Sequence, residues 1–176
     1  MSILKFLGIG SAVGSPAASD PDTEAVRKII DELDHLPDER ARFVAAFAFI
    51  LSRVAHADMD ISSEETAAME RIVVEHGALP EKLAIIVVQM AKTQNILFGG
   101  TDNYIVTREF TRLADRDQKI ALLDCLYAVS AADRTISTAE DNVIRQIADE
   151  LKLDHVEFIS VRARYRDHLA VLKKPE

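Results

Sequence analysis

The sequence has few residues that cross-link a chain or interrupt a helix. Its 176 residues include one cysteine, Cys125, no tryptophan, six glycines and five prolines. A single cysteine excludes an intrachain disulfide, and we interpret Cys125, which lies in an apolar run, as a buried, unreactive thiol in a reducing cytoplasm. The scarcity of helix breakers, with 48% hydrophobic and 28% charged residues, favours helices around a sizeable core.

The charge balance of the chain is acidic. There are 29 Asp and Glu residues against 21 Lys and Arg residues, which gives a formal net charge of -8. Nucleic acid is therefore a poor class of partner, because binding its phosphates requires a basic surface. A negative surface suits cations or the basic surfaces of proteins, so we expect protein partners.

No uncharged apolar stretch of the sequence is long enough to span a membrane. Residues 1–20 contain the glycines, serines and proline typical of a linker, so we predict a flexible tail. The tail contains a short apolar segment at residues 3–7, interrupted by Lys5, and weak binding of this segment to a membrane surface is an alternative. We expect a cytoplasmic protein, with peripheral association at the inner face of the membrane as that alternative.

Helix start signals recur along residues 21–176, which we predict to form one all-α domain. In a capping box, an oxygen-bearing side chain and a Glu or Gln three residues later each accept a hydrogen bond from a backbone N–H of the first turn. The sequence offers four such pairs: Ser62 with Glu65, Asp115 with Gln118, Ser137 with Glu140, and Asp154 with Glu157. With Pro and Gly as boundary residues, these signals predict eight helices, at about 21–35, 38–57, 62–76, 80–99, 102–113, 116–132, 138–151 and 155–172.

The second half of this domain repeats the first. A shift of 75 residues places Ala57-Asp58 on Ala132-Asp133, Ile61-Ser62 on Ile136-Ser137, and Glu65 on Glu140, without a gap. Other matching positions are apolar residues at helical spacing, as two similar helical cores require. We therefore predict two four-helix halves, at about 21–100 and 101–176, each with an acidic turn between its second and third helices.

The two acidic turns are the candidate functional sites, and we call residues 58–65 turn one and residues 133–140 turn two. The candidate metal ligands are Asp58, Asp60, Glu65, Asp133 and Glu140. Ligands that are all oxygen favour a hard divalent cation such as Ca²⁺ or Mg²⁺. The alternative is structural: Glu65 and Glu140 occupy the third position of capping boxes, where negative charge stabilises a helix N-terminus. Two or three carboxylates also fall short of a complete oxygen cage.

With this repeated motif, the chain resembles the TerB-like tellurite-resistance family. The second half carries the closer match, in residues 122–129, in Ala132-Asp133-x-x-Ile136-Ser137-x-x-Glu140, and in residues 143–151. The first half carries a looser copy at residues 54–65, and the resemblance covers roughly residues 24–170.

The resemblance implies an all-helical fold of two similar four-helix halves, a role in resistance to tellurite and other stress, and a metal site at the acidic motif. The motif positions carried over are Asp58 and Glu65 in turn one, and Asp133 and Glu140 in turn two. The family usually has Gly after the Asp, where this chain has Met59 and Arg134. Either the turn geometry differs here, or a residue other than Gly adopts a strained left-handed conformation.

We expect the two turns to differ in their affinity for a cation. Turn one has four carboxylates: Asp58, Asp60, Glu64 and Glu65. Turn two has Thr135 and Ala139 at two of the matching positions, and Arg134 adds a positive charge. Clustered carboxylates repel one another and a cation relieves that repulsion, so turn one is the tighter predicted site.

Two other polar features have structural interpretations. His76, just before Gly77, is typical of a helix C-terminus. The basic stretch at residues 162–166 is typical of a solvated helix face, with docking of an acidic partner as the alternative.

Catalytic motifs are missing from the sequence. No phosphate loop, nucleophile elbow or HExxH motif occurs, and no nucleophile is paired with a base. We therefore expect a non-enzymatic stress-response protein that binds a divalent cation and contacts partner proteins. The alternative is a helical scaffold or adaptor without a metal site, whose acidic turns only cap helices.

Overall fold

The fold is an assembly of helices in a computed structural model that describes residues 21–55, 63–93, 103–132 and 134–172. Within these ranges there are eight α-helices, two short 3-10 helices and no strand, which confirms the predicted all-α class. The helices are α2 (Pro21–Asp34), α3 (Asp38–Ser52), α4 (Ser63–Gly77), α5 (Glu81–Lys92), α7 (Asn103–Leu113), α8 (Arg116–Ala131), α9 (Thr138–Glu150), α10 (His155–Arg164), η1 (Arg166–His168) and η2 (Ala170–Leu172).

Three of the four predicted capping boxes are present in the structure, and each lies at the start of a helix. Both hydrogen bonds of the box are present at the starts of α8, α9 and α10, formed by the pairs Asp115 with Gln118, Ser137 with Glu140, and Asp154 with Glu157. The fourth predicted box includes Ser62, which lies outside the described residues. Local sequence therefore places helix starts in the second half to within one residue, because each cap satisfies backbone groups that the helix itself leaves open.

The prediction that the last helix continues to residue 172 is wrong, because α10 ends at Arg164. After Tyr165, η1 and η2 follow with the extended residue Leu169 between them. Leu169 is buried and forms an isolated parallel bridge with Ile136: the Ile136 N–H donates to His168 O at 2.7 Å, and the Ala170 N–H donates to Ile136 O at 2.9 Å. The chain leaves the helix because these contacts hold residues 166–172 against turn two.

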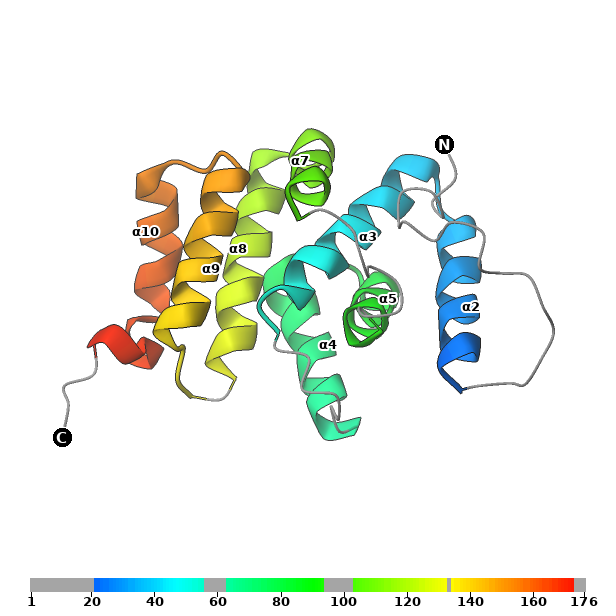
Figure 1. Cartoon of the computed structure of the whole chain (residues 1–176), viewed down its shortest axis with the longest axis horizontal. Helices are drawn as coiled ribbons and strands as arrows, with labels where there is room; N and C mark the ends of the chain where they lie inside the picture. Colours follow the sequence, from blue (N-terminus) through cyan, green and yellow to red (C-terminus); the bar gives the residue numbers. More distant parts are fainter. Residues whose placement is uncertain (1–20, 56–62, 94–102, 133, 173–176) are drawn as a thin grey trace.

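The core is built around α3 and α8, the second helix of each sequence repeat. Every residue from Phe43 to Leu51 is buried, as is every residue from Leu122 to Ala128. α3 packs against α5 and α7, and α8 packs against α4, α9 and α10. Figure 1 shows α8, α9 and α10 side by side at one end of the molecule and α2 at the other end. Because α3 contacts α7 and α4 contacts α8, the two predicted halves share one hydrophobic core.

Three phenylalanines join the halves at the contact between α3 and α7. The ring centroids of Phe43 and Phe110 are 5.0 Å apart, and those of Phe47 and Phe110 are 6.1 Å apart in an edge arrangement. Phe110 belongs to the second repeat, and its ring is fully buried against the two phenylalanines of the first repeat. Such aromatic pairs contribute beyond their buried area, so this cluster is a principal link between the repeats.

Gly77 ends α4, within one residue of the predicted helix end, and it also has a role in packing. It is the last residue of α4, and the following residue, Ala78, adopts the left-handed conformation with φ 52°. A Cβ atom on Gly77 would lie 2.9 Å from Cζ of the buried Phe47. Glycine is therefore required here for the close approach of α4 to α3.

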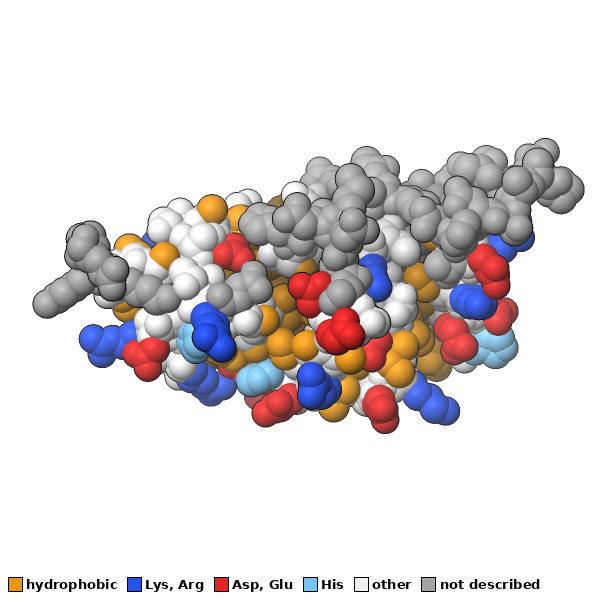
Figure 2. Space-filling view, turned by 90° about the horizontal axis from the view of Figure 1, so that it is seen from below, with side chains coloured by type: hydrophobic (Ala, Val, Ile, Leu, Met, Phe, Trp, Pro, Cys, Tyr) orange, Lys and Arg blue, Asp and Glu red, His pale blue; other side chains and the backbone are white. Residues whose placement is uncertain are grey.

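The surface of the described helices carries exposed apolar side chains among charged ones. In the space-filling view, hydrophobic side chains lie between acidic and basic ones in the middle of the face seen from below (Figure 2). The exposed large hydrophobic residues are Val74, Ile85, Tyr104, Ile105, Val156, Ile159, Val171 and Leu172. Among the described helices, none combines the length and the apolar character that a membrane span requires.

Candidate functional site: the acidic turns and the contacts around them

Turn two is held in a strained conformation. Arg134, at the position where the resemblance leads us to expect Gly, has φ 66°. Of the two alternatives left open by the sequence, a residue other than Gly therefore accepts the left-handed conformation here. The backbone of Ile136 is fixed on both sides by the bridge to Leu169. Asp133, a predicted ligand, lies outside the described residues.

The carboxylate of Glu140, the other predicted ligand of turn two, is engaged in capping α9. Its Oε2 atom accepts hydrogen bonds from the backbone N–H of Ser137 at 2.8 Å and from Ser137 Oγ at 2.6 Å. The Glu140 N–H in turn lies 3.2 Å from Ser137 Oγ. Glu140 therefore caps α9, which is the structural role that the sequence analysis gives as the alternative to metal binding.

Asp141, the residue directly after turn two, carries a further carboxylate, which the sequence reasoning missed. Its oxygens accept hydrogen bonds from the Tyr127 hydroxyl at 2.8 Å, and from Arg162 Nη2 at 2.7 Å and Nε at 3.0 Å. Burial disfavours the charged form of Asp141, but the hydrogen bonds from Arg162 and Tyr127 outweigh it and lower the pKa of Asp141 below its ordinary value. This side chain therefore ties α8, α9 and α10 together.

The start of α4 includes the last residues of turn one, and it carries two exposed carboxylates, Glu64 and Glu65. Among the described residues, Glu64 accepts a long hydrogen bond from Ser63 Oγ at 3.3 Å. The predicted ligands Asp58 and Asp60 lie outside the described residues. Among the residues that are described, no group of three or more His, Cys, Asp or Glu side chains is arranged to hold a metal ion. Metal binding at turn one therefore stays a prediction that depends on Asp58 and Asp60.

A polar cluster around Asp124 joins the two repeats. Asp124 Oδ2, on α8, lies 2.8 Å from His76 Nδ1 on α4, and Oδ1 lies 3.3 Å from Arg164 Nη1. The hydroxyl of Tyr165 lies 3.1 Å from both the carbonyl oxygen and Oδ1 of Asp124. Burial, with the negative charge of Asp124, raises the pKa of Tyr165. His76 thus contacts a neighbouring helix in addition to ending its own.

These contacts correct the interpretation of residues 162–166 as a solvated basic face at Arg162 only, because Arg164 and Arg166 are exposed. Arg162 is bound by Asp141, and Arg164 lies beside Asp124. Both carboxylates are more than twenty residues away in the sequence and lie on other helices. No local pattern in the sequence indicates such pairs.

A second inter-repeat contact links the end of α3 to α9. Arg53 donates through Nη1 to Glu150 Oε2 at 2.7 Å and through Nη2 to Oε1 at 3.1 Å, and Nη1 also donates to Thr107 on α7 at 3.1 Å. The side chains of Arg53 and Glu150 are only 8% and 14% exposed. Burial disfavours the ionised form of Glu150, yet the hydrogen bonds from Arg53 outweigh it and lower the pKa of Glu150.

Cys125 is buried in α8, as predicted. Burial, with the nearby negative charge of Asp124, raises the pKa of its thiol far above the ordinary value. Because the thiolate is the reactive form, Cys125 is not an activated nucleophile.

The fold and the repeated turn define a class of all-helical protein with capped, acidic connections between helices. A family model described as Tellurite resistance protein TerB matches residues 44–163, more than half of the chain. The chain belongs to the TerB family, which confirms the resemblance seen in the sequence. No curated protein and no solved structure matches it.

Replacing Arg134 with Gly is expected to raise the free energy of unfolding by roughly 0.5–1 kcal/mol, because Gly adopts the left-handed conformation without the steric cost of a side chain. Urea denaturation followed by circular dichroism measures the change. Lys152→Gly is the matched control, since Lys152 has a similar φ of 61° away from turn two. If Lys152→Gly stabilises the protein and Arg134→Gly destabilises it, contacts of the Arg134 side chain outweigh the backbone strain.

Proposed function

We propose that this TerB-family chain is a non-enzymatic stress-response protein that binds a divalent cation, Ca²⁺ or Mg²⁺, at turn one and contacts partner proteins. The observation that supports this proposal is the contrast between the two turns. At turn two, the carboxylate of Glu140 is engaged by capping, and that of Asp141, the next residue, is engaged by Arg162. At turn one, Glu64 is exposed in the first turn of α4, directly after the sequence that contains Asp58 and Asp60.

The physical basis of the proposal is relief of charge repulsion. Four carboxylates within eight residues repel one another, and the chain as a whole carries a net charge of -8. A hard cation with oxygen ligands neutralises such a cluster, whereas Arg134 already supplies a positive charge at turn two.

The second candidate function is a helical scaffold or adaptor with no metal site. The three complete capping boxes favour it, because capping alone accounts for acidic residues at helix starts. The shared core also gives a rigid body that needs no ion to hold its repeats together.

Calorimetric titration of the full chain with Ca²⁺ and then Mg²⁺ separates the two candidates. We expect binding heat for at least one ion, and the double variant Asp58→Asn/Asp60→Asn to weaken binding by about tenfold or more, because two carboxylate ligands lose their charge. Asp133→Asn is the matched control at turn two and should weaken binding by about twofold or less.

Two outcomes of this titration contradict the proposal. If neither ion gives binding heat, the cation-binding function is wrong and the scaffold function replaces it. Loss of binding in Asp133→Asn, with binding retained in the double variant, assigns the ion to turn two.

A further inference from the structure

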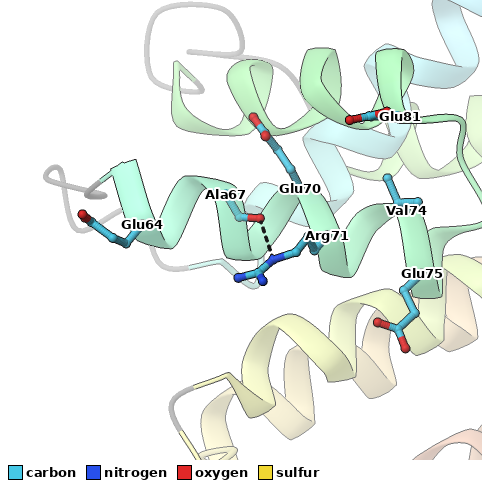
Figure 3. Close-up of a pocket in the computed structure, with 7 residues that line it drawn as sticks. All are labelled: Glu64, Ala67, Glu70, Arg71, Val74, Glu75 and Glu81. Carbon is cyan, nitrogen blue, oxygen red and sulfur yellow. Dashed lines mark hydrogen bonds between the residues drawn. The ribbon is translucent and has the colours of Figure 1, made fainter.

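An open hollow of about 770 Å³ runs along the outer side of α4. Four glutamates line it, Glu64, Glu70 and Glu75 from α4 and Glu81 from the start of α5, together with Arg71 and Val74. In Figure 3, Glu70 and Val74 point from α4 toward the side where Glu81 lies, and Glu75 points to the other side of α4. The hollow thus has carboxylates on both of its sides.

The charges of this hollow are unbalanced. None of its four glutamates forms an ion pair with any residue in the described part of the chain, whereas Glu109, Asp141 and Glu150 are each bound by an arginine. Among the lining residues that the structure describes, the one cation is Arg71, which donates its Nε to the carbonyl oxygen of Ala67 at 3.3 Å (Figure 3). Within the described part of the chain, the hollow therefore has a surplus of negative charge.

Two apolar side chains, Ala67 and Val74, lie between the carboxylates, with Arg71 between them along α4. Ala67 and Val74 are both exposed, and the Val74 side chain keeps its exposure of 39% within a helix whose other sides pack against α5 and α8. Positions 67, 71 and 74 are spaced by three and four residues, so they follow one face of α4. From position 64 to position 75 this face extends roughly 16 Å, about three helical turns.

We propose that this hollow is the docking surface for a basic amphipathic helix of a partner protein. Lysine and arginine side chains of such a helix would meet Glu70, Glu75 and Glu81, and its apolar face would cover Ala67 and Val74. Charge complementarity selects this partner, because an acidic or neutral helix would leave the glutamates unpaired against it. The inference deepens the partner-binding part of the proposed function and does not depend on the cation.

The test uses the full chain and a synthetic peptide of leucine and lysine, about 14 residues long, with one apolar and one basic face over roughly four helical turns. Binding is measured by fluorescence anisotropy. The triple variant Glu70→Gln/Glu75→Gln/Glu81→Gln is expected to weaken binding by about tenfold or more. It spares Glu64, so calorimetry on the same variant should still detect the cation if turn one binds one. Loss of peptide binding and loss of the cation site are therefore separate results.

A matched variant tests whether the position of the charges matters. Glu32→Gln/Asp149→Asn/Asp167→Asn removes the same number of charges from exposed carboxylates elsewhere and should weaken peptide binding by about twofold or less. Val74→Ser should weaken binding by about threefold, because it removes apolar contact area. If both triple variants lose peptide affinity equally, the proposal is wrong, and the peptide is attracted by the net negative charge of the protein and not by the hollow. A self-association of the wild type that only the hollow variant abolishes, seen by light scattering, also overturns it and assigns the surface to a second copy.

Discussion

Replacing Arg53 with Met is expected to lower the free energy of unfolding by about 2–3 kcal/mol, because it leaves the partly buried carboxylate of Glu150 without its cation. Methionine fills a similar volume but has no charge and no N–H group. The Glu150 side chain is 14% exposed, so water replaces little of the lost interaction. Thr107 also loses the hydrogen bond from Arg53 Nη1. Urea denaturation at neutral pH measures the loss.

The double variant Arg53→Met/Glu150→Met is the control for this prediction. It removes both charges, so it should be more stable than Arg53→Met alone, because no unpaired charge stays buried. If the single and the double variant are equally destabilised, packing of the Arg53 side chain and not the ion pair accounts for the loss.

The same ion pair gives a pH dependence. Burial opposes ionisation of Glu150, but the hydrogen bonds from Arg53 hold its pKa below the ordinary value of a Glu carboxyl. A lowered pKa stabilises the fold above the unfolded-state pKa, and this stabilisation is lost as the pH falls through the folded-state pKa. The difference in free energy of unfolding between wild type and Arg53→Met should therefore become smaller as the pH falls below the ordinary pKa of a Glu carboxyl.

Phe110→Ala is expected to cost about 3–5 kcal/mol, because it leaves a cavity where a fully buried ring packs between α7 and α3. Since this ring links the two repeats, unfolding of the variant should still be a single transition at a lower urea concentration. Far-ultraviolet circular dichroism and tyrosine fluorescence should give coincident curves. Two separated transitions would show that the repeats unfold independently.

Val156→Ala provides the comparison for this effect. Val156 is 76% exposed on α10, so its truncation should change the free energy of unfolding by about 0.5 kcal/mol or less. A loss in Val156→Ala similar to that in Phe110→Ala would contradict the assignment of the core to buried side chains.

The sequence predicts helix starts well because the signals are local. Asp115, Ser137 and Asp154 each satisfy backbone groups within their own first turn, so the residues that decide the start lie within four positions. The end of α10 has no such local signal. It is decided by burial of Leu169 beside Ile136, a contact that only the folded chain brings together.

The candidate site was predictable to a similar extent. The capping role of Glu140 follows from its spacing to Ser137, and the structure has that contact. The sequence left open whether the geometry of turn two differs or whether Arg134 adopts a strained conformation. The φ of 66° at Arg134 shows that the conformation is strained. Asp141 was missed because its partner, Arg162, lies 21 residues away on another helix. Long-range pairs of this kind depend on how helices pack and not on residue spacing.

The stacking of Tyr127 and Tyr165 has an optical consequence. Their rings are 5.5 Å apart and inclined by 16°, one on α8 and the other just after α10. They are two of only three tyrosines in a chain without tryptophan. Coupled transitions of two stacked phenols give a near-ultraviolet circular dichroism band that no indole signal obscures. The protein therefore carries an intrinsic spectroscopic reporter of whether the end of α10 is docked, readable without a label.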